Sequence, residues 1–284
     1  YPSQLLTMLL DDGYQADVQN FGHSSETSYC IGARIGSTLA YLSEDVTIPA
    51  GGSASLGNTA DGGLIKSVMD GKVAFKSTRD DTNPVLIGTH LCNIAINGSA
   101  YTVSLVEPST KDVVLPKNAI LVVGGETLRN CDAAIVYQGL NNWQELTMEK
   151  WIKANVDVRK TIPKTFVIAP TTPAWFFWED VDGHGVSVET THAHFQSRCY
   201  EEFGVYFIDL YDVMSQRIGL DMALADGKIA AITAEDEAAV ANNQTPPSLT
   251  LSGTANDVHF NAAGYYVMAK YIYGRITQVL KIAR

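Results

Sequence analysis

Two patterns of apolar residues divide this chain and restrict its fold more than any other feature of the sequence. Towards both ends, short apolar runs alternate with segments of helical periodicity, whereas the middle holds short β-branched runs separated by Gly, Asn and Pro. Apolar strands that alternate with helices are typical of a parallel sheet covered on both faces. The predicted strands span 16–22, 132–138, 164–170 and 205–210, and the predicted helices span 3–12, 24–36, 147–160, 189–203 and 261–281.

The β-branched runs in the middle of the chain predict a separate β subdomain. They occupy about residues 45–118, between the predicted strands 16–22 and 132–138. A βαβ connection needs only about 30 residues, so this segment is far longer than a crossover. We therefore predict an α/β domain from residues 1–44 and 119–284 with an inserted all-β subdomain. The insert is either a decorative or oligomerising β barrel or a module that contacts carbohydrate.

The balance of charges excludes several classes of partner. The 284 residues include 20 Lys and Arg against 31 Asp and Glu, which gives a formal net charge of −11, and no basic run interrupts this excess. Nucleic acid and anionic membrane surfaces are therefore not expected as partners. The longest apolar runs are much shorter than the ~18–20 residues of a membrane span. Neutral small molecules fit this charge better.

Neither the cysteines nor the histidines predict a metal or redox site. The four cysteines form no CxxC pair and are interpreted as buried or partly buried thiols. His192 and His194, with Asp182 and His184 nearby, could suggest a metal site. However, two histidines two positions apart on a predicted helix point in different directions. We therefore predict no metal ion and no cofactor.

Three polar segments follow predicted strands or precede the final helix. They are Asn-Phe-Gly at 20–22, Gly-Leu-Asn-Asn at 139–142 and Asn-Asp-Val-His-Phe-Asn at 256–261. In this order they resemble the N-x-G, G-x-N-D and D-x-x-H-x-N blocks of the SGNH (GDSL-like) hydrolase family. The resemblance covers about residues 1–45 and 131–284. It implies a flavodoxin-like (SGNH) parallel sheet with helices on both faces.

The same resemblance implies roles for individual residues in acyl transfer. The backbone N–H of Gly22 and the side-chain amide of Asn141 would donate to the oxyanion, which needs donors about 2.7–3.1 Å away. Glycine suits the first position because it lets the backbone approach the substrate closely. His259 would take the proton of the nucleophile. Asp257, Asn256 or a backbone carbonyl would orient the histidine, as the aspartate does in a catalytic triad.

The motifs depart from the family pattern at three positions. Ser25 replaces the second glycine of the first block, Asn142 replaces the acid of the second, and Asn256 stands at the aspartate position of the third, with Asp257 one residue later. Two functions therefore stay open. One is an SGNH-type serine esterase that acts on a small ester, such as an O-acetyl group of a carbohydrate. The other is a catalytically degenerate SGNH domain that binds glycan as a phage-tail or cell-surface module.

The family's nucleophile, the serine of a G-D-S turn, is not found among residues 1–284. Ser24 and Ser25 lie near the expected site but are better explained as helix caps. We expect a segment upstream of Tyr1, at least ~8–15 residues long, to supply this serine at the end of one more strand. That strand would lie between the predicted strands 16–22 and 132–138, because the sheet order of the resembled fold places it there.

Overall fold

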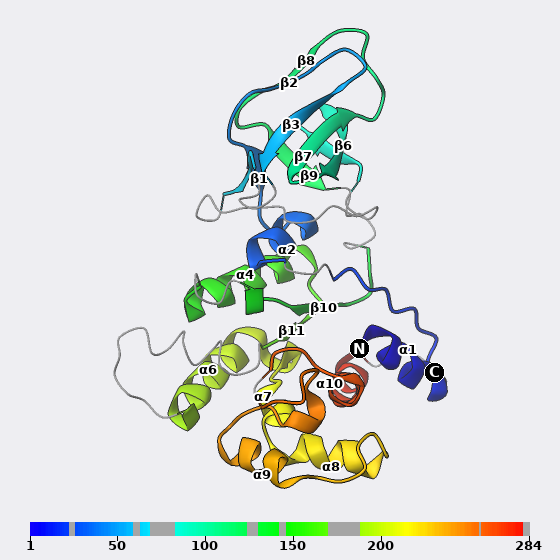
Figure 1. Ribbon diagram of the computed structural model, residues 1–284, viewed down its shortest axis with the longest axis vertical. Coiled ribbons are helices and arrows are strands. Elements are labelled where there is room, and N and C mark those ends of the chain that lie inside the picture. Colours follow the sequence, from blue (N-terminus) through cyan, green and yellow to red (C-terminus); the bar gives the residue numbers. More distant parts are fainter. Residues whose placement is uncertain are drawn as a thin grey trace. The chain divides into compact units, whose positions relative to one another are not determined.

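The structure, a computed structural model, falls into two compact units (Figure 1). The sheet unit comprises Phe21–Ala134 and Glu149–Thr165, and the helical unit comprises Tyr1–Asn20, Ile135–Met148 and Phe166–Arg284. The residues that the structure describes are 1–22, 26–58, 63–68, 83–123, 130–141, 146–169, 188–255 and 257–280. Within these ranges, every helix is too short or too polar to cross a membrane.

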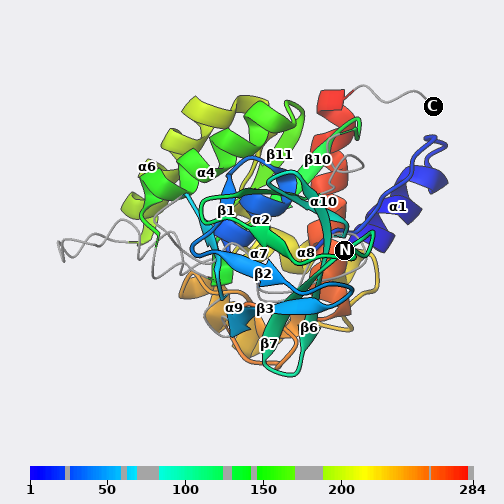
Figure 2. The same ribbon diagram turned by 90° about the horizontal axis from the view of Figure 1, so that it is seen from above.

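Antiparallel strands make up the sheet unit. They are β1 (Ala40–Leu42), β2 (Val46–Ile48), β3 (Ser53–Asn58), β4 (Ile65–Ser67), β5 (Val85–Ile87), β6 (His90–Asn97), β7 (Ala100–Leu105), β8 (Val113–Leu115) and β9 (Ile120–Val123). Seven of them form one sheet in the order β3-β7-β6-β5-β9-β1-β4, in which every pairing is antiparallel. Figure 2 shows β3, β6 and β7 side by side. The remaining two strands, β2 and β8, pair with each other.

This architecture corrects the predicted fold class. The main sheet is antiparallel, so the prediction of a flavodoxin-like parallel sheet is wrong. The sheet also extends past the predicted subdomain 45–118 at both ends. β1 precedes that range and β9 follows it, and the two strands pair with Tyr41 opposite Ile120. The segments that enter and leave the middle of the chain are thus themselves neighbouring strands of the sheet.

One face of the seven-stranded sheet forms a core. Val85 and Ile87 of β5 are fully buried, whereas Leu86 between them is 39% exposed. This alternation follows from the two-residue period of a strand, which sends successive side chains to opposite faces. Helix α2 (Ser28–Ile35) packs against β4 and β9, and its Ala33 belongs to the same buried cluster.

Helix α2 begins and ends with standard caps. The side chain of Thr27 accepts a hydrogen bond from Cys30 N at 3.4 Å, which satisfies one of the free N–H groups of the first turn. Gly36 ends the helix in a left-handed conformation with φ 81°, which glycine adopts without strain. The cap is therefore Thr27, while the expected caps Ser24 and Ser25 lie outside the described residues.

The helical unit contains a small sheet in the order β10 (Ala134–Tyr137), β11 (Thr165–Ile168) and β12 (Phe207–Ile208), with β11 and β12 parallel. The predicted strand 16–22 is wrong, because residues 14–22 form neither helix nor strand. Asp17 and Gln19 are exposed there and hydrogen-bonded to each other at 2.8 Å. An inner strand of a parallel sheet is buried on both faces, which this polar segment does not allow.

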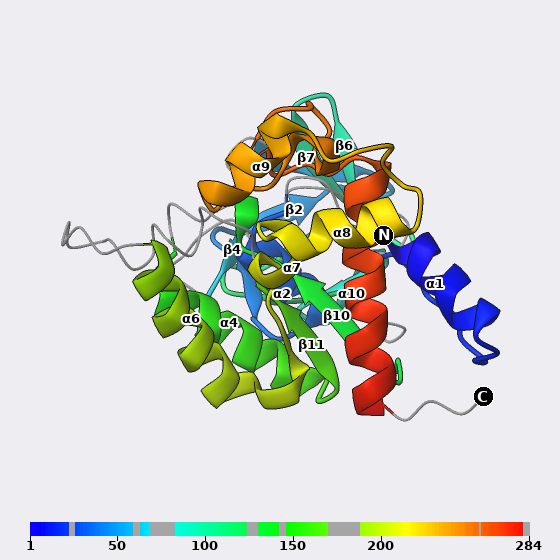
Figure 3. The ribbon, with the colours of Figure 1, turned by 90° about the horizontal axis from the view of Figure 1, so that it is seen from below.

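Helices surround this small sheet (Figure 3). They are α1 (Pro2–Asp11), α6 (Val188–Phe203), α7 (Tyr211–Met214), α8 (Arg217–Ala225), α9 (Ala234–Ala241) and α10 (Ala262–Leu280), with the 3₁₀ turns η3 (Gly204–Tyr206) and η4 (Pro247–Leu249). A further helix, α4 (Met148–Thr161), lies almost entirely in the sheet unit. The long helix α10 confirms the predicted closing helix and packs against α1, α7, α8 and η4. Its contact stripe includes the buried Met268, Ile272 and Ile276.

Candidate active site

His259 lies in a loop just before α10, and backbone contacts close this loop at its base. Thr250 and Phe260 form an antiparallel bridge, and Leu251 N donates to His259 O at 2.8 Å. Phe260 is buried, whereas the side chain of His259 is 72% exposed. The loop is therefore anchored by Phe260 and exposes His259 to solvent.

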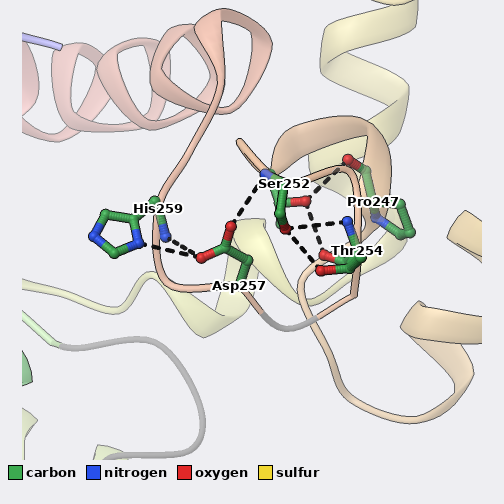
Figure 4. A network of polar contacts seen from close by, with 6 residues as sticks. Pro247, Ser252, Thr254, Asp257 and His259 are labelled. Atoms are coloured by element: carbon green, nitrogen blue, oxygen red, sulfur yellow. Dashed lines mark hydrogen bonds and ion pairs between the residues drawn. The ribbon is translucent and has the colours of Figure 1, made fainter.

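Asp257 holds the imidazole of His259 from one side. Its Oδ1 lies 3.2 Å from His259 Nδ1 and also accepts the backbone N–H of His259 at 3.0 Å. Figure 4 shows Asp257 between His259 and Ser252, whose N–H donates to the other carboxylate oxygen at 3.1 Å. The carboxylate thus has both oxygens occupied by donors, which fixes its orientation.

These contacts keep Asp257 ionised. The backbone N–H of His259, followed by hydrogen bonds from Ser252, lowers the pKa of Asp257 to about 2. An ionised carboxylate only accepts hydrogen bonds, so Nδ1 of His259 carries the proton in this pair. The lone pair of the neutral ring is then on Nε2, and among the described residues no group is hydrogen-bonded to this atom.

Two polar anchors, one buried and one partly buried, hold the segment that leads to this loop. Asp236 is fully buried and forms the capping box of α9 with the N-cap residue Thr233. Its carboxylate also accepts hydrogen bonds from the backbone N–H and the hydroxyl of Ser248, at 2.9 and 2.7 Å. Asn261 donates from Nδ2 to Ser248 O at 2.9 Å, and its Oδ1 accepts Gly264 N at 3.0 Å in the first turn of α10. A continuous series of hydrogen bonds therefore links α9, η4 and α10 around His259.

The other predicted site residues are placed as follows. Asn141 is exposed in the turn after β10, in the helical unit together with His259 and Asp257. Gly22 is exposed and belongs to the sheet unit, so its role as an oxyanion donor stays a prediction. Asn256 lies outside the described residues. The structure thus brings together His259 and Asp257.

A second cluster of His and carboxylate side chains escaped the sequence reasoning. Nε2 of His192 on α6 lies 2.7 Å from Oδ2 of Asp209, which directly follows β12, and Asp212 of α7 is close to both. Burial, followed by the charge of Asp209, raises the pKa of Asp212. The sequence did contain a signal for this cluster, namely an acidic residue, Asp209, at the carboxyl end of a predicted strand. Ligands of open α/β sheets bind beyond such strand ends. The sequence argument instead placed His192 beside Asp182 and His184, which lie outside the described residues.

No protein-family model, curated protein or solved structure matches the chain. The resemblance to the SGNH hydrolases therefore stays a prediction, and the chemistry of the site is argued from the geometry of its residues.

Proposed function

We propose that the protein hydrolyses a small neutral ester and that His259 is its general base. The observation that carries the proposal is the exposed imidazole of His259, which Asp257 holds through Nδ1 so that Nε2 faces away from the carboxylate (Figure 4). This is the arrangement in which a histidine accepts a proton from an attacking hydroxyl.

The proposed step moves one proton. Nε2 of His259 takes it as the oxygen of a serine hydroxyl or a water molecule attacks the ester carbonyl, and the imidazolium later returns it to the leaving alcohol. Asp257 stays ionised and stabilises the imidazolium by its negative charge. Asn141 is the proposed side-chain donor to the oxyanion that forms on the carbonyl oxygen.

The charge of the chain supports a neutral substrate. With a net charge of −11, the protein repels anionic esters at long range. An acetyl ester of a carbohydrate is neutral and small enough to reach a side chain that is exposed on a loop. We therefore propose O-acetylated carbohydrate as the substrate class.

Hydrolysis of p-nitrophenyl acetate by the full chain tests this function. We expect His259→Ala to lower kcat/KM by about 10³-fold or more and Asp257→Asn by about 10²–10⁴-fold, because they remove the base and its orienting group. The matched controls are His194→Ala, an exposed histidine of α6, and Asp221→Asn, an exposed carboxylate of α8 paired with Arg217. Both controls should hydrolyse the ester at the unaltered rate.

Two outcomes would contradict the proposal. One is an absence of hydrolysis by the unaltered protein towards p-nitrophenyl acetate and acetylated oligosaccharides alike, which would favour the glycan-binding module. The other is equal activity of the His259→Ala variant and its control. Labelling by a fluorophosphonate probe separates the two possible nucleophiles, since only an activated serine is modified.

A further inference from the structure

The cluster around His192 is built from three separate elements of the helical unit. His192 comes from α6, Asp209 from the residue after β12 and Asp212 from α7. One ligand atom of each residue lies within 4.8 Å of the other two. The Asp209 side chain is fully buried and that of His192 is 11% exposed, so this is an interior cluster rather than a chance meeting of surface charges.

The negative charges of the two carboxylates in this cluster are only weakly balanced by hydrogen-bond donors. Besides His192, their shared side-chain donor is Gln196, whose Nε2 lies 3.3 Å from Asp209 and 3.4 Å from both oxygens of Asp212. These distances exceed the usual 2.7–3.2 Å of an N–H···O bond. Asp209 also accepts Tyr211 N at 3.0 Å, whereas the side chain of Asp212 has no acceptor contact other than those with Gln196 among the described residues.

No Lys or Arg side chain pairs directly with either carboxylate in the part of the chain that the structure describes. Arg275 lies close enough for its charge to act on Asp212, but its guanidinium donates to the backbone oxygen of Phe207 at 3.3 Å. A fully buried and a partly buried carboxylate with one imidazole and one amide between them are unfavourable unless they are paired or coordinate a metal. The cluster therefore has both the donor atoms and the excess negative charge that a cation requires.

We propose that His192, Asp209 and Asp212 bind one divalent transition-metal ion, of which Zn²⁺ and Mn²⁺ are the leading candidates. One imidazole nitrogen with carboxylate oxygens is a mixed donor set that suits these ions better than Mg²⁺ or Ca²⁺, which prefer oxygen ligands alone. Rotation of the Gln196 amide by half a turn would replace its Nε2 by Oε1 and supply a fourth oxygen. The site is separate from His259, so it stands or falls independently of the proposed esterase activity.

The neighbours of His192 hold its ring in place. The Tyr211 ring packs against the imidazole, with the two ring centroids 4.0 Å apart. The backbone N–H of Tyr211 donates to Oδ1 of Asp209, the carboxylate oxygen that does not contact His192. Ligands whose orientation is fixed by packing and by further hydrogen bonds lose little freedom when an ion binds. This favours metal binding by the folded chain over binding by the unfolded chain.

Titration of the EDTA-treated, dialysed full chain with ZnCl₂ or MnCl₂ in a calorimeter tests the site. We expect one ion per chain. His192→Gln and Asp212→Asn should each weaken binding by at least about 10–100-fold, the loss seen when even an outer partner of a metal ligand is removed. The matched controls are His194→Gln on the same helix and His259→Gln in the other His–carboxylate pair, and both should bind the ion as the unaltered protein does.

Thermal unfolding of the same proteins supplies a second readout that does not depend on activity. The ion should raise the unfolding midpoint of the unaltered protein and of both controls but not of the Asp212→Asn variant. Asp212 is only partly buried, so this variant keeps the fold testable if His192→Gln unfolds. The proposal is overturned if the unaltered protein binds neither ion, if Asp212→Asn binds it equally well, or if His259→Gln abolishes binding.

Discussion

At the scale of single residues, burial separates a structural ion pair from a pair available for chemistry. Arg34 donates from Nε and Nη2 to the two carboxylate oxygens of Glu26 at 3.0 and 2.6 Å, and the two side chains are 5% and 4% exposed. Neither charge can reach a ligand from solvent. His259 and Asp257 also pair a basic side chain with a carboxylate, but the imidazole lies at the surface, where 72% of the His259 side chain is exposed.

The buried pair makes a prediction about stability. Glu26→Gln keeps the shape of the side chain but leaves the Arg34 charge buried without a counterion, which should lower the free energy of unfolding by about 3–5 kcal/mol. Urea denaturation measures this change. The control is Asp157→Asn, which breaks a pair with the exposed Lys153 and Lys160 and should change the free energy by no more than about 1 kcal/mol. Equal effects of the two substitutions would contradict the role assigned to burial.

Single residues of the candidate site were predictable to different degrees. His259, Asp257 and Asn256 stood out because the spacing of the motif is local. The contact between Asp257 and the ring was not available from spacing, since it depends on the backbone turn that brings Asp257 Oδ1 to 3.2 Å from His259 Nδ1. The partners of His192 were harder still, because Asp209 is 17 positions away and meets it only after α6 and β12 have packed.

At the scale of elements, the helices were predicted better than the strands. The apolar periodicity of α1, α4, α6 and α10 is a property of each segment by itself, and the structure confirms all four. A strand depends on its partners, so the predicted run 205–210 shrinks to Phe207–Ile208 after the 3₁₀ turn η3. Helix α9 was missed, although Thr233 and Asp236 form the capping box that marks a helix start.

Two glycines of α10 should respond in opposite ways to alanine. A Cβ on Gly264 would lie 2.2 Å from Leu249 O, where η4 approaches the helix, whereas a Cβ on Gly274 would meet nothing within 4 Å. We expect Gly264→Ala to lower the free energy of unfolding by about 1–3 kcal/mol or more through overpacking. Gly274→Ala should raise it by up to about 1 kcal/mol, because alanine favours the helix. Urea denaturation of both variants measures the difference, and two effects of the same sign would argue against this packing of α10 on η4.

At the scale of the whole molecule, the predicted fold class was wrong because the sequence did not show which strands pair with each other. The residue types of the strands were not the cause of the error. The β-branched runs did become strands, but β5 pairs with both β6 and β9, and β1 pairs with both β4 and β9. The pairings of β9 with β1 and β5 join segments that are far apart in sequence, and no periodicity within one segment encodes them. The chain also passes between the two units several times.

Acid sensitivity is also a property of the whole molecule, and Asp257 makes a defined contribution to it. A carboxyl group whose pKa is lower in the folded than in the unfolded chain stabilises the fold above the unfolded value, ~3.9 for Asp. That contribution is lost as the pH falls through the folded value, which is about 2 for Asp257. The ion pair with Lys270 lowers the pKa of Asp226, so this group also stabilises the fold above pH ~4. Burial raises the pKa of Asp212, so that its ionised form makes the fold less stable.

We therefore expect the unaltered protein and its Asp257→Asn variant to converge in stability in acid. At neutral pH the variant should be less stable, because an amide cannot replace the ionised acceptor of the His259 and Ser252 N–H groups. The difference should begin to shrink below pH ~4 and should be mostly lost by about pH 2, because the carboxyl is then protonated in the unfolded chain and about half protonated in the folded chain. Urea denaturation of the metal-free proteins at stepped pH values measures this difference. A difference that stays constant from pH 7 to pH 2 would show that the Asp257 charge does not stabilise the loop that carries His259.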